Sequence, residues 1–88
     1  MKVTKKLLKK IRSMEMDDIR VFLADNRKAK DIATEKVAAA VRCTTQTVRN
    51  TEDGRCCSPF VLLYEIALME DPEIIIALIN RYKQLFDK

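Results

Sequence analysis

A polar run from Thr44 to Asn50 holds the side chains of this sequence that are best suited to recognising another molecule. The run reads TTQTVRN and brings hydroxyl, amide and guanidinium groups together. Such groups hydrogen-bond to base edges and phosphates, and an arginine can bind guanine through two bonds. Threonine and asparagine are indifferent helix formers, whereas the preceding EKVAAAV is prone to form a helix. We therefore expect the polar run to be kept for contact with a partner.

Groups that would support catalysis or hold a metal are scarce. The chain has no histidine, no phosphate-cradling loop and no nucleophile elbow, and Gly54 is its single glycine. Its three cysteines, Cys43, Cys56 and Cys57, contain no CxxC pair and would leave a zinc ion one soft ligand short. The sequence therefore predicts no enzyme, no cofactor and no metal site. A zinc-stapled or redox-sensing domain stays open, and it would require Cys43 to lie near Cys56 and Cys57.

Length and charge indicate one small domain with an anionic partner. The chain of 88 residues is expected to form a single domain over 1–88, with a formal net charge of +4. Basic residues exceed acidic ones by six over residues 1–30, balance them over 31–57, and fall two short over 58–88. A basic end favours nucleic acid, although such runs often only solvate a helix.

A membrane partner is not expected. No apolar run approaches the ~18 residues of a membrane span, and no cleavage site follows the basic N-terminus. KKLLKKIR could lie on a membrane surface, but it lacks an aromatic anchor. We expect a cytoplasmic protein.

Hydrophobic periodicity and helix-start signals predict an all-α fold, a small bundle of about five helices. Ser58 and Asp71 are candidate N-caps, each followed by a proline at the first helical position. On the helix after Ser58, we expect a buried face that is widened by Leu62, Tyr64, Ile66 and Leu68. Its centre is expected to be Phe60, Leu63 and Ala67. The connection 26–30 is expected to be polar, and the segment before it is also strand-like. The first expected helix begins near residue 3 and ends between 13 and 16. The others cover about 17 or 18–26, 31 or 34–41, 44 or 45–53, 59–69 and 72–86, with Asp17 or Asp18 capping the second and Asp31 or Thr34 the third.

Three residues have the spacing required by a helix-turn-helix. Such a unit needs a small residue where two helices cross, an apolar residue in the turn, and an apolar residue that faces back to the core. Ala38, Cys43 and Val48 supply these at offsets of five and five. The polar residues of the second helix then gather on its opposite face.

The segment TEKVAAAVRCTTQTVRN resembles the helix-turn-helix of the lambda-repressor-like superfamily, and most closely that of the phage CII-type transcription activators. The similarity rests on a TEK-x-A-x-AV opening, a turn and a polar second helix with Val48 buried, and extends to SPFVLLYEIAL. It implies a sequence-specific DNA-binding transcriptional regulator of phage or prophage type, commonly a dimer or tetramer. The recognition helix, about residues 44–53, would lie in the major groove.

These considerations predict three sets of residues. The DNA base contacts would be Thr45, Gln46, Arg49 and Asn50. The phosphate contacts would be Thr34, Lys36, Arg42, Thr44, Thr47 and Arg55, with further help from lysines of the first helix. The last helix is apolar around most of its circumference, which suggests an oligomer interface formed by Ile75, Ile76, Ile79, Tyr82 and Phe86.

Two departures from the family pattern keep an alternative open. Arg42 stands where glycine is usual, and a non-glycine residue with positive φ costs roughly 1 kcal/mol. Thr51 stands where an apolar residue is expected, and Glu52 and Asp53 would approach a phosphate backbone with the wrong sign. The alternative is a protein–protein interaction module, such as an antirepressor or adaptor, on a helix-turn-helix scaffold.

Overall fold

The structure is a computed structural model that describes residues 3–87. This part of the chain forms six α-helices and no strand, so the all-α prediction is confirmed, with six helices where about five were expected. The strand-like segment before residue 26 is helical. The helices are α1 (Lys5–Arg12), α2 (Met16–Ala29), α3 (Thr34–Val41), α4 (Thr45–Asp53), α5 (Pro59–Ala67) and α6 (Pro72–Phe86).

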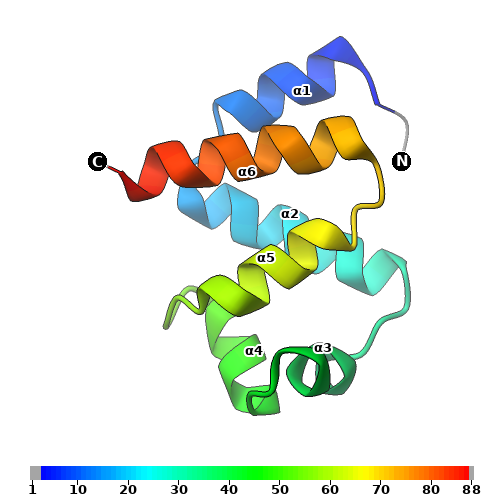
Figure 1. The fold of residues 1–88 in the computed structure, drawn as a ribbon, viewed down its shortest axis with the longest axis vertical. Helices are drawn as coiled ribbons and strands as arrows, with labels where there is room; N and C mark the ends of the chain where they lie inside the picture. The colour runs from blue at the N-terminus through cyan, green and yellow to red at the C-terminus, as the bar shows by residue number, and fades with distance from the viewer. Residues whose placement is uncertain (1–2, 88) are drawn as a thin grey trace.

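The helices lie in a flattened particle of 35 × 30 × 17 Å. At one end of its long axis α1 packs along α6, and at the other end α3 packs against α4 (Figure 1). Between these pairs, α2 and α5 connect the two ends. No helix of residues 3–87 combines the length and the apolar composition needed to cross a bilayer.

Two clusters of buried side chains stabilise this arrangement. The larger core takes residues from α1, α2, α5 and α6, including Ile11, Leu23, Leu62 and Leu78. The smaller core joins α3, α4 and α5 and consists of Val37, Ala38, Val48 and Val61. Because α5 contributes to both cores, it links the α3–α4 end to the rest of the protein.

The two proline-marked helix starts are confirmed. Ser58 Oγ accepts a hydrogen bond from the Val61 N–H at 3.5 Å, and Asp71 Oδ1 accepts one from the Glu73 N–H at 3.0 Å. Pro59 and Pro72 follow these caps in the first turn, where a missing N–H has no cost. The hydrogen bonds of these caps are local, which is why the sequence predicts them well.

The predicted caps of the second and third helices are wrong. Glu15 is the N-cap of α2, and Asp18, three residues later, accepts a hydrogen bond from the Glu15 N–H at 3.0 Å. Ala33 precedes α3 without a side-chain cap. Asp31 instead terminates α2 in the left-handed conformation, with φ of 58°. The segment 26–30 therefore continues α2 to Ala29 rather than forming a connection.

The buried face of α5 differs from the prediction at its centre, although Leu62 and Ile66, which were expected to widen that face, are buried. Phe60, Leu63 and Ala67 are exposed, and Phe60 reaches 72% exposure. The side chains that α5 buries are Val61, Leu62, Glu65 and Ile66. Hydrophobic periodicity does not predict burial of Glu65, because a carboxylate is normally exposed to solvent.

Candidate nucleic-acid interface

A three-residue turn joins α3 to α4. Arg42 takes the left-handed conformation, with φ of 58° and ψ of 51°, and the Cys43 N–H donates to the Ala38 carbonyl at 2.9 Å. Thr44 then caps α4, since its Oγ1 accepts from the Thr47 N–H at 3.1 Å. The chain therefore reverses tightly at a non-glycine residue and accepts a conformational cost of roughly 1 kcal/mol.

The three predicted anchor residues meet in the smaller core. Val48 is fully buried and Ala38 is nearly so, and half-buried Cys43 packs against them. A small residue at position 38 lets α4 approach α3 closely, and Val48 holds α4 from behind. The inner side of α4 is thus fixed by contacts with α3 and α5.

Thr51 belongs to the same inner side. It is fully buried, and its hydroxyl donates to the Thr47 carbonyl at 2.8 Å and lies 3.5 Å from Cys56 Sγ. Because its hydroxyl has a partner within its own helix, threonine fills an apolar position without leaving a polar group unsatisfied. The departure noted in the sequence therefore does not disturb the packing.

The four predicted base-contacting residues are all on α4, but with unequal exposure. Gln46 and Arg49 are exposed, whereas Thr45 and Asn50 are half-buried. Gln46 Nε2 donates to Asn50 Oδ1 at 2.9 Å, one helical turn away. Arg49 Nη2 lies 3.8 Å from Glu35 Oε1 of α3. The outer face of α4 thus presents an amide pair and a guanidinium with a weak surface partner.

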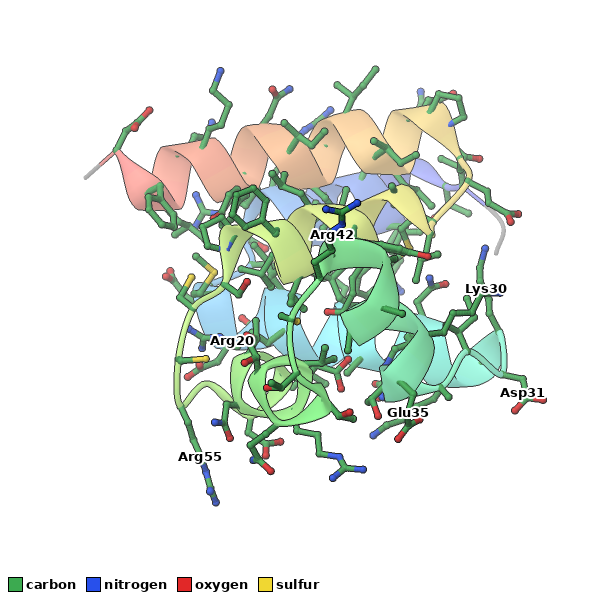
Figure 2. All side chains as sticks on the ribbon, turned by 60° about the horizontal axis from the view of Figure 1, so that its bottom comes forward. Arg20, Lys30, Asp31, Glu35, Arg42 and Arg55 are labelled. Carbon is green, nitrogen blue, oxygen red and sulfur yellow. The ribbon has the colours of Figure 1, made fainter. Side chains whose placement is uncertain are left out.

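Three of the six predicted phosphate-contacting residues are exposed cations. Arg42 lies at the end of α3 and Arg55 beyond the end of α4, well apart in Figure 2. Lys36 is exposed on α3. Thr44 is exposed, whereas Thr34 and Thr47 are half-buried, and the Thr44 and Thr47 hydroxyls bond each other at 2.9 Å. The cations therefore offer separate contacts for a long anionic chain.

The lysines of α1 are not part of this surface, contrary to expectation. The helix lies against α6 at the end of the molecule opposite α3 and α4 (Figure 1). A contact with the same short stretch of a partner would have to extend along the 35 Å axis. Lysine-rich composition predicted the charge of this helix but not its position.

A buried ion cluster between α2, α4 and α5 was not predicted from the sequence. Arg27 of α2 donates to Glu52 of α4 through two hydrogen bonds, Nε–Oε2 at 2.7 Å and Nη2–Oε1 at 3.0 Å. Its Nη1 donates to the Ile32 carbonyl at 2.6 Å, and its Nε lies 3.7 Å from Glu65 Oε2 of α5. Glu52 therefore points toward α2, which removes the expected clash with a phosphate backbone at Glu52, whereas Asp53 is exposed and keeps its charge on the surface. Arg27 and Glu52 are 25 residues apart in sequence, so local sequence patterns do not predict that they form a pair.

The protonation of this cluster follows from one cation facing two carboxyl groups. Burial raises the pKa of Glu65 to about 9, and the neighbouring Glu52 adds to the effect. Burial opposes the ionisation of Glu52, but its interactions with Glu65 and Arg27 outweigh this and lower the Glu52 pKa. We therefore assign a neutral Glu65 beside an ionised Glu52–Arg27 pair at neutral pH.

The thiols do not form a site. Cys43 precedes α4 and Cys56 and Cys57 follow it, so the length of the helix separates the two groups. All three cysteines are free, and residues 3–87 contain no group of three or more potential metal ligands.

The predicted oligomer interface is only partly available. Ile76 and Phe86 are exposed, at 59% and 54%. Ile75 and Ile79 are half-buried and pack against the larger core, and Tyr82 belongs to that core. The tyrosine ring lies 5.0 Å from the ring of Phe86. Tyr82 must be corrected to a core residue of the single chain, because its surface is already covered.

Comparisons with models of protein families, with curated proteins and with solved structures found no match to this chain.

Proposed function

We propose that α3, the turn at Arg42 and α4 form a helix-turn-helix that binds double-stranded DNA, and that the protein is a sequence-specific transcriptional regulator. The observation that supports this most is the division of α4 into two sides. Val48 and Thr51 are fully buried, while Gln46 and Arg49 are exposed on the same nine-residue helix. A helix with one anchored side and one polar side fits the width of the major groove.

The exposed side chains can be released for DNA at little cost. The Arg49–Glu35 pair is solvent-exposed, and such pairs contribute about 0–1 kcal/mol. A good bidentate base contact is worth about 1–3 kcal/mol. Because a base contact is worth more than a surface ion pair, Arg49 can exchange its contact with Glu35 for one with a guanine. Gln46 can likewise exchange its hydrogen bond with Asn50 for one with an adenine.

Charge supplies the part of the affinity that does not depend on sequence. Lys36, Arg42 and Arg55 are exposed around α4 and can each neutralise a phosphate. Glu52, in contrast, is paired with Arg27, so Asp53 is the exposed carboxylate that remains at the end of α4. Binding should therefore weaken steeply with salt.

The test begins with selection of duplexes from a randomised library, followed by titrations on the selected and on a scrambled duplex. Arg49→Ala should lower the affinity ratio between the two by about 5- to 150-fold, the equivalent of 1–3 kcal/mol. Lys36→Ala should weaken both complexes alike. Lys83→Ala on α6 removes an exposed cation that lies outside α1, α3 and α4, so it is the control and should leave the ratio unchanged. An equal loss on both duplexes for Arg49→Ala would remove Arg49 from sequence reading.

The exposed apolar side chains favour self-association and keep a protein-interaction module as second candidate. Phe60, Leu63, Ile76 and Phe86 are the exposed large hydrophobics of α5 and α6 among the described residues. We propose a homodimer or tetramer in which Ile76 and Phe86 contribute to the interface. Sedimentation should show an oligomer that Phe86→Ser weakens. A monomer that binds another protein tightly and shows no salt-dependent DNA binding would favour an adaptor or antirepressor instead.

A further inference from the structure

The outer face of α1 is strongly basic and has no partner within the described chain. Its cations are all exposed, and none lies within 4.0 Å of a carboxylate of residues 3–87. Elsewhere in residues 3–87, Arg20, Arg27, Lys30, Arg49 and Arg81 each have such a partner, and Lys28, Lys36, Arg42, Arg55 and Lys83 do not, so α1 stands out by the density of its unpaired cations. The basic face of α1 consists of Lys5, Lys6, Lys9, Lys10 and Arg12.

The placement of the first two of these charges opposes the stability of the helix, whereas Lys9, Lys10 and Arg12 lie in the last turn, where the helix dipole favours cations. No acidic residue occupies the first turn of α1, and Lys5 and Lys6 lie there at the positive end of the helix dipole. Lys5 and Lys9, and likewise Lys6 and Lys10, are like-charged neighbours one turn apart. An anionic partner on this face would relieve both effects.

The apolar side of α1 packs against the larger core of the same chain. Ile11 is fully buried in the larger core, and Leu7 packs against it. A membrane-surface helix inserts its apolar side among lipids, which α1 could do only by leaving α6. The partner must therefore be recognised by charge, through groups that the helix meets from outside.

The charge density of the face matches that of a nucleic-acid backbone. Five cations in an eight-residue helix correspond to one charge per about 2.4 Å of helix axis. Duplex DNA carries one negative charge per about 1.7 Å. The five cations spread around the outward half of α1 and do not form a single row, but the two charge densities are similar, which favours a duplex over a protein with scattered carboxylates.

We propose that the basic face of α1 binds the phosphate backbone of a second DNA duplex, so that one chain bridges two segments of DNA. The inference rests on the proposed binding of a first duplex by α4. The two surfaces lie at opposite ends of the 35 Å axis (Figure 1). One duplex would have to bend around the protein to reach both, whereas two segments can bind without deformation.

A capture experiment separates the two binding events. A selected duplex is fixed to beads and saturated with protein, and a labelled duplex of random sequence is added after washing. The variant K5Q/K6Q/K9Q/K10Q should remain on the beads as the wild type does, since its α4 is unchanged. It should capture at least tenfold less labelled duplex, and the log–log salt slope of capture should fall by about 4. The variant K5R/K6R/K9R/K10R keeps the charge and should capture as the wild type does.

The outcomes distinguish the two proposals. Equal capture by the wild type and the glutamine variant would overturn the inference, because bridging would then come from an oligomer with two α4 surfaces. No capture by the wild type would also overturn it, including the case in which α1 binds anionic phospholipid vesicles instead. In both cases retention on the beads would leave the proposed function standing. Failure of the protein to stay on its selected duplex would contradict the proposed function and the inference with it.

Discussion

Replacement of Glu65 by glutamine should make the free energy of unfolding less dependent on pH. Glu65 is 1% exposed, and burial raises its pKa to about 9 from an ordinary value of 4.5. The folded state therefore binds this proton more tightly than the unfolded state. Its contribution to stability is complete below about pH 4.5 and is lost as the pH rises toward 9.

The size of the effect follows from the difference between the two pKa values. In this range the free energy of unfolding falls by about 1.4 kcal/mol per pH unit, so the wild type loses about 3 kcal/mol by about pH 7 from this group alone. Glutamine has a similar shape and cannot ionise. The stability of Glu65→Gln relative to the wild type should therefore rise by about 3 kcal/mol from about pH 4.5 to 7.

Urea unfolding followed by helical circular dichroism measures this directly. Curves recorded at several values between about pH 5 and 8 give the free energy of unfolding by linear extrapolation. Asp25→Asn, which removes an exposed carboxylate of α2 that has no ion pair, is the control for loss of one negative charge. Parallel pH profiles for the wild type and Glu65→Gln would refute the reasoning, because they would mean that folding does not change the protonation of Glu65.

Two further substitutions test the surroundings of α4. Arg27→Ala should lower the free energy of unfolding by about 3–5 kcal/mol, measured in urea at neutral pH, because it leaves buried Glu52 without its cation; a loss below 1 kcal/mol would show that the pair is hydrated. Arg42→Gly should raise the free energy of unfolding by roughly 0.5–1 kcal/mol, since glycine tolerates a φ of 58°. The same variant should bind selected and scrambled duplexes more weakly. Reduced stability would contradict strain at this turn.

Features that depend on neighbours in sequence could be predicted from the chain alone. The starts of α5 and α6 follow from Ser58–Pro59 and Asp71–Pro72, and the end of α4 follows from Gly54 in the left-handed conformation, with φ of 82°. The predicted contact between Ala38, Cys43 and Val48 is likewise present in the smaller core. In each case a hydrogen bond or a contact across one or two turns is enough to determine the local structure.

Features that depend on a distant charge could not be predicted. Glu65 lies on the buried face of α5 beside Arg27, which is 38 residues away in sequence. Periodicity counts only the apolar residues of α5, so it predicts burial of Phe60 and gives no sign that Glu65 is buried. The polar and basic composition of residues 26–30 predicts a connection at Arg27, whereas the structure continues α2 through this residue. A buried charge is compatible with folding only when its partner is present, and one-dimensional spacing does not reveal the partner.

The helix ends show how a chain with one glycine makes tight turns. Asp31, Arg42 and Glu70 have φ values of 58°, 58° and 66°, a conformation that usually favours glycine. Each follows a helix whose last carbonyl groups need partners. The gain from closing these helix ends offsets a local cost of about 1–2 kcal/mol per residue.

Amide chemical-shift mapping during titration with a selected duplex tests the central claim most directly, because it reports which residues meet DNA in the intact chain. We expect the largest shifts at Thr45 to Asn50 of α4 and in the preceding turn, with contacts between Gln46 or Arg49 side chains and base protons in the major groove. Shifts confined to α5 and α6, with α4 unaffected, would contradict the assignment of α4 as the helix that reads DNA.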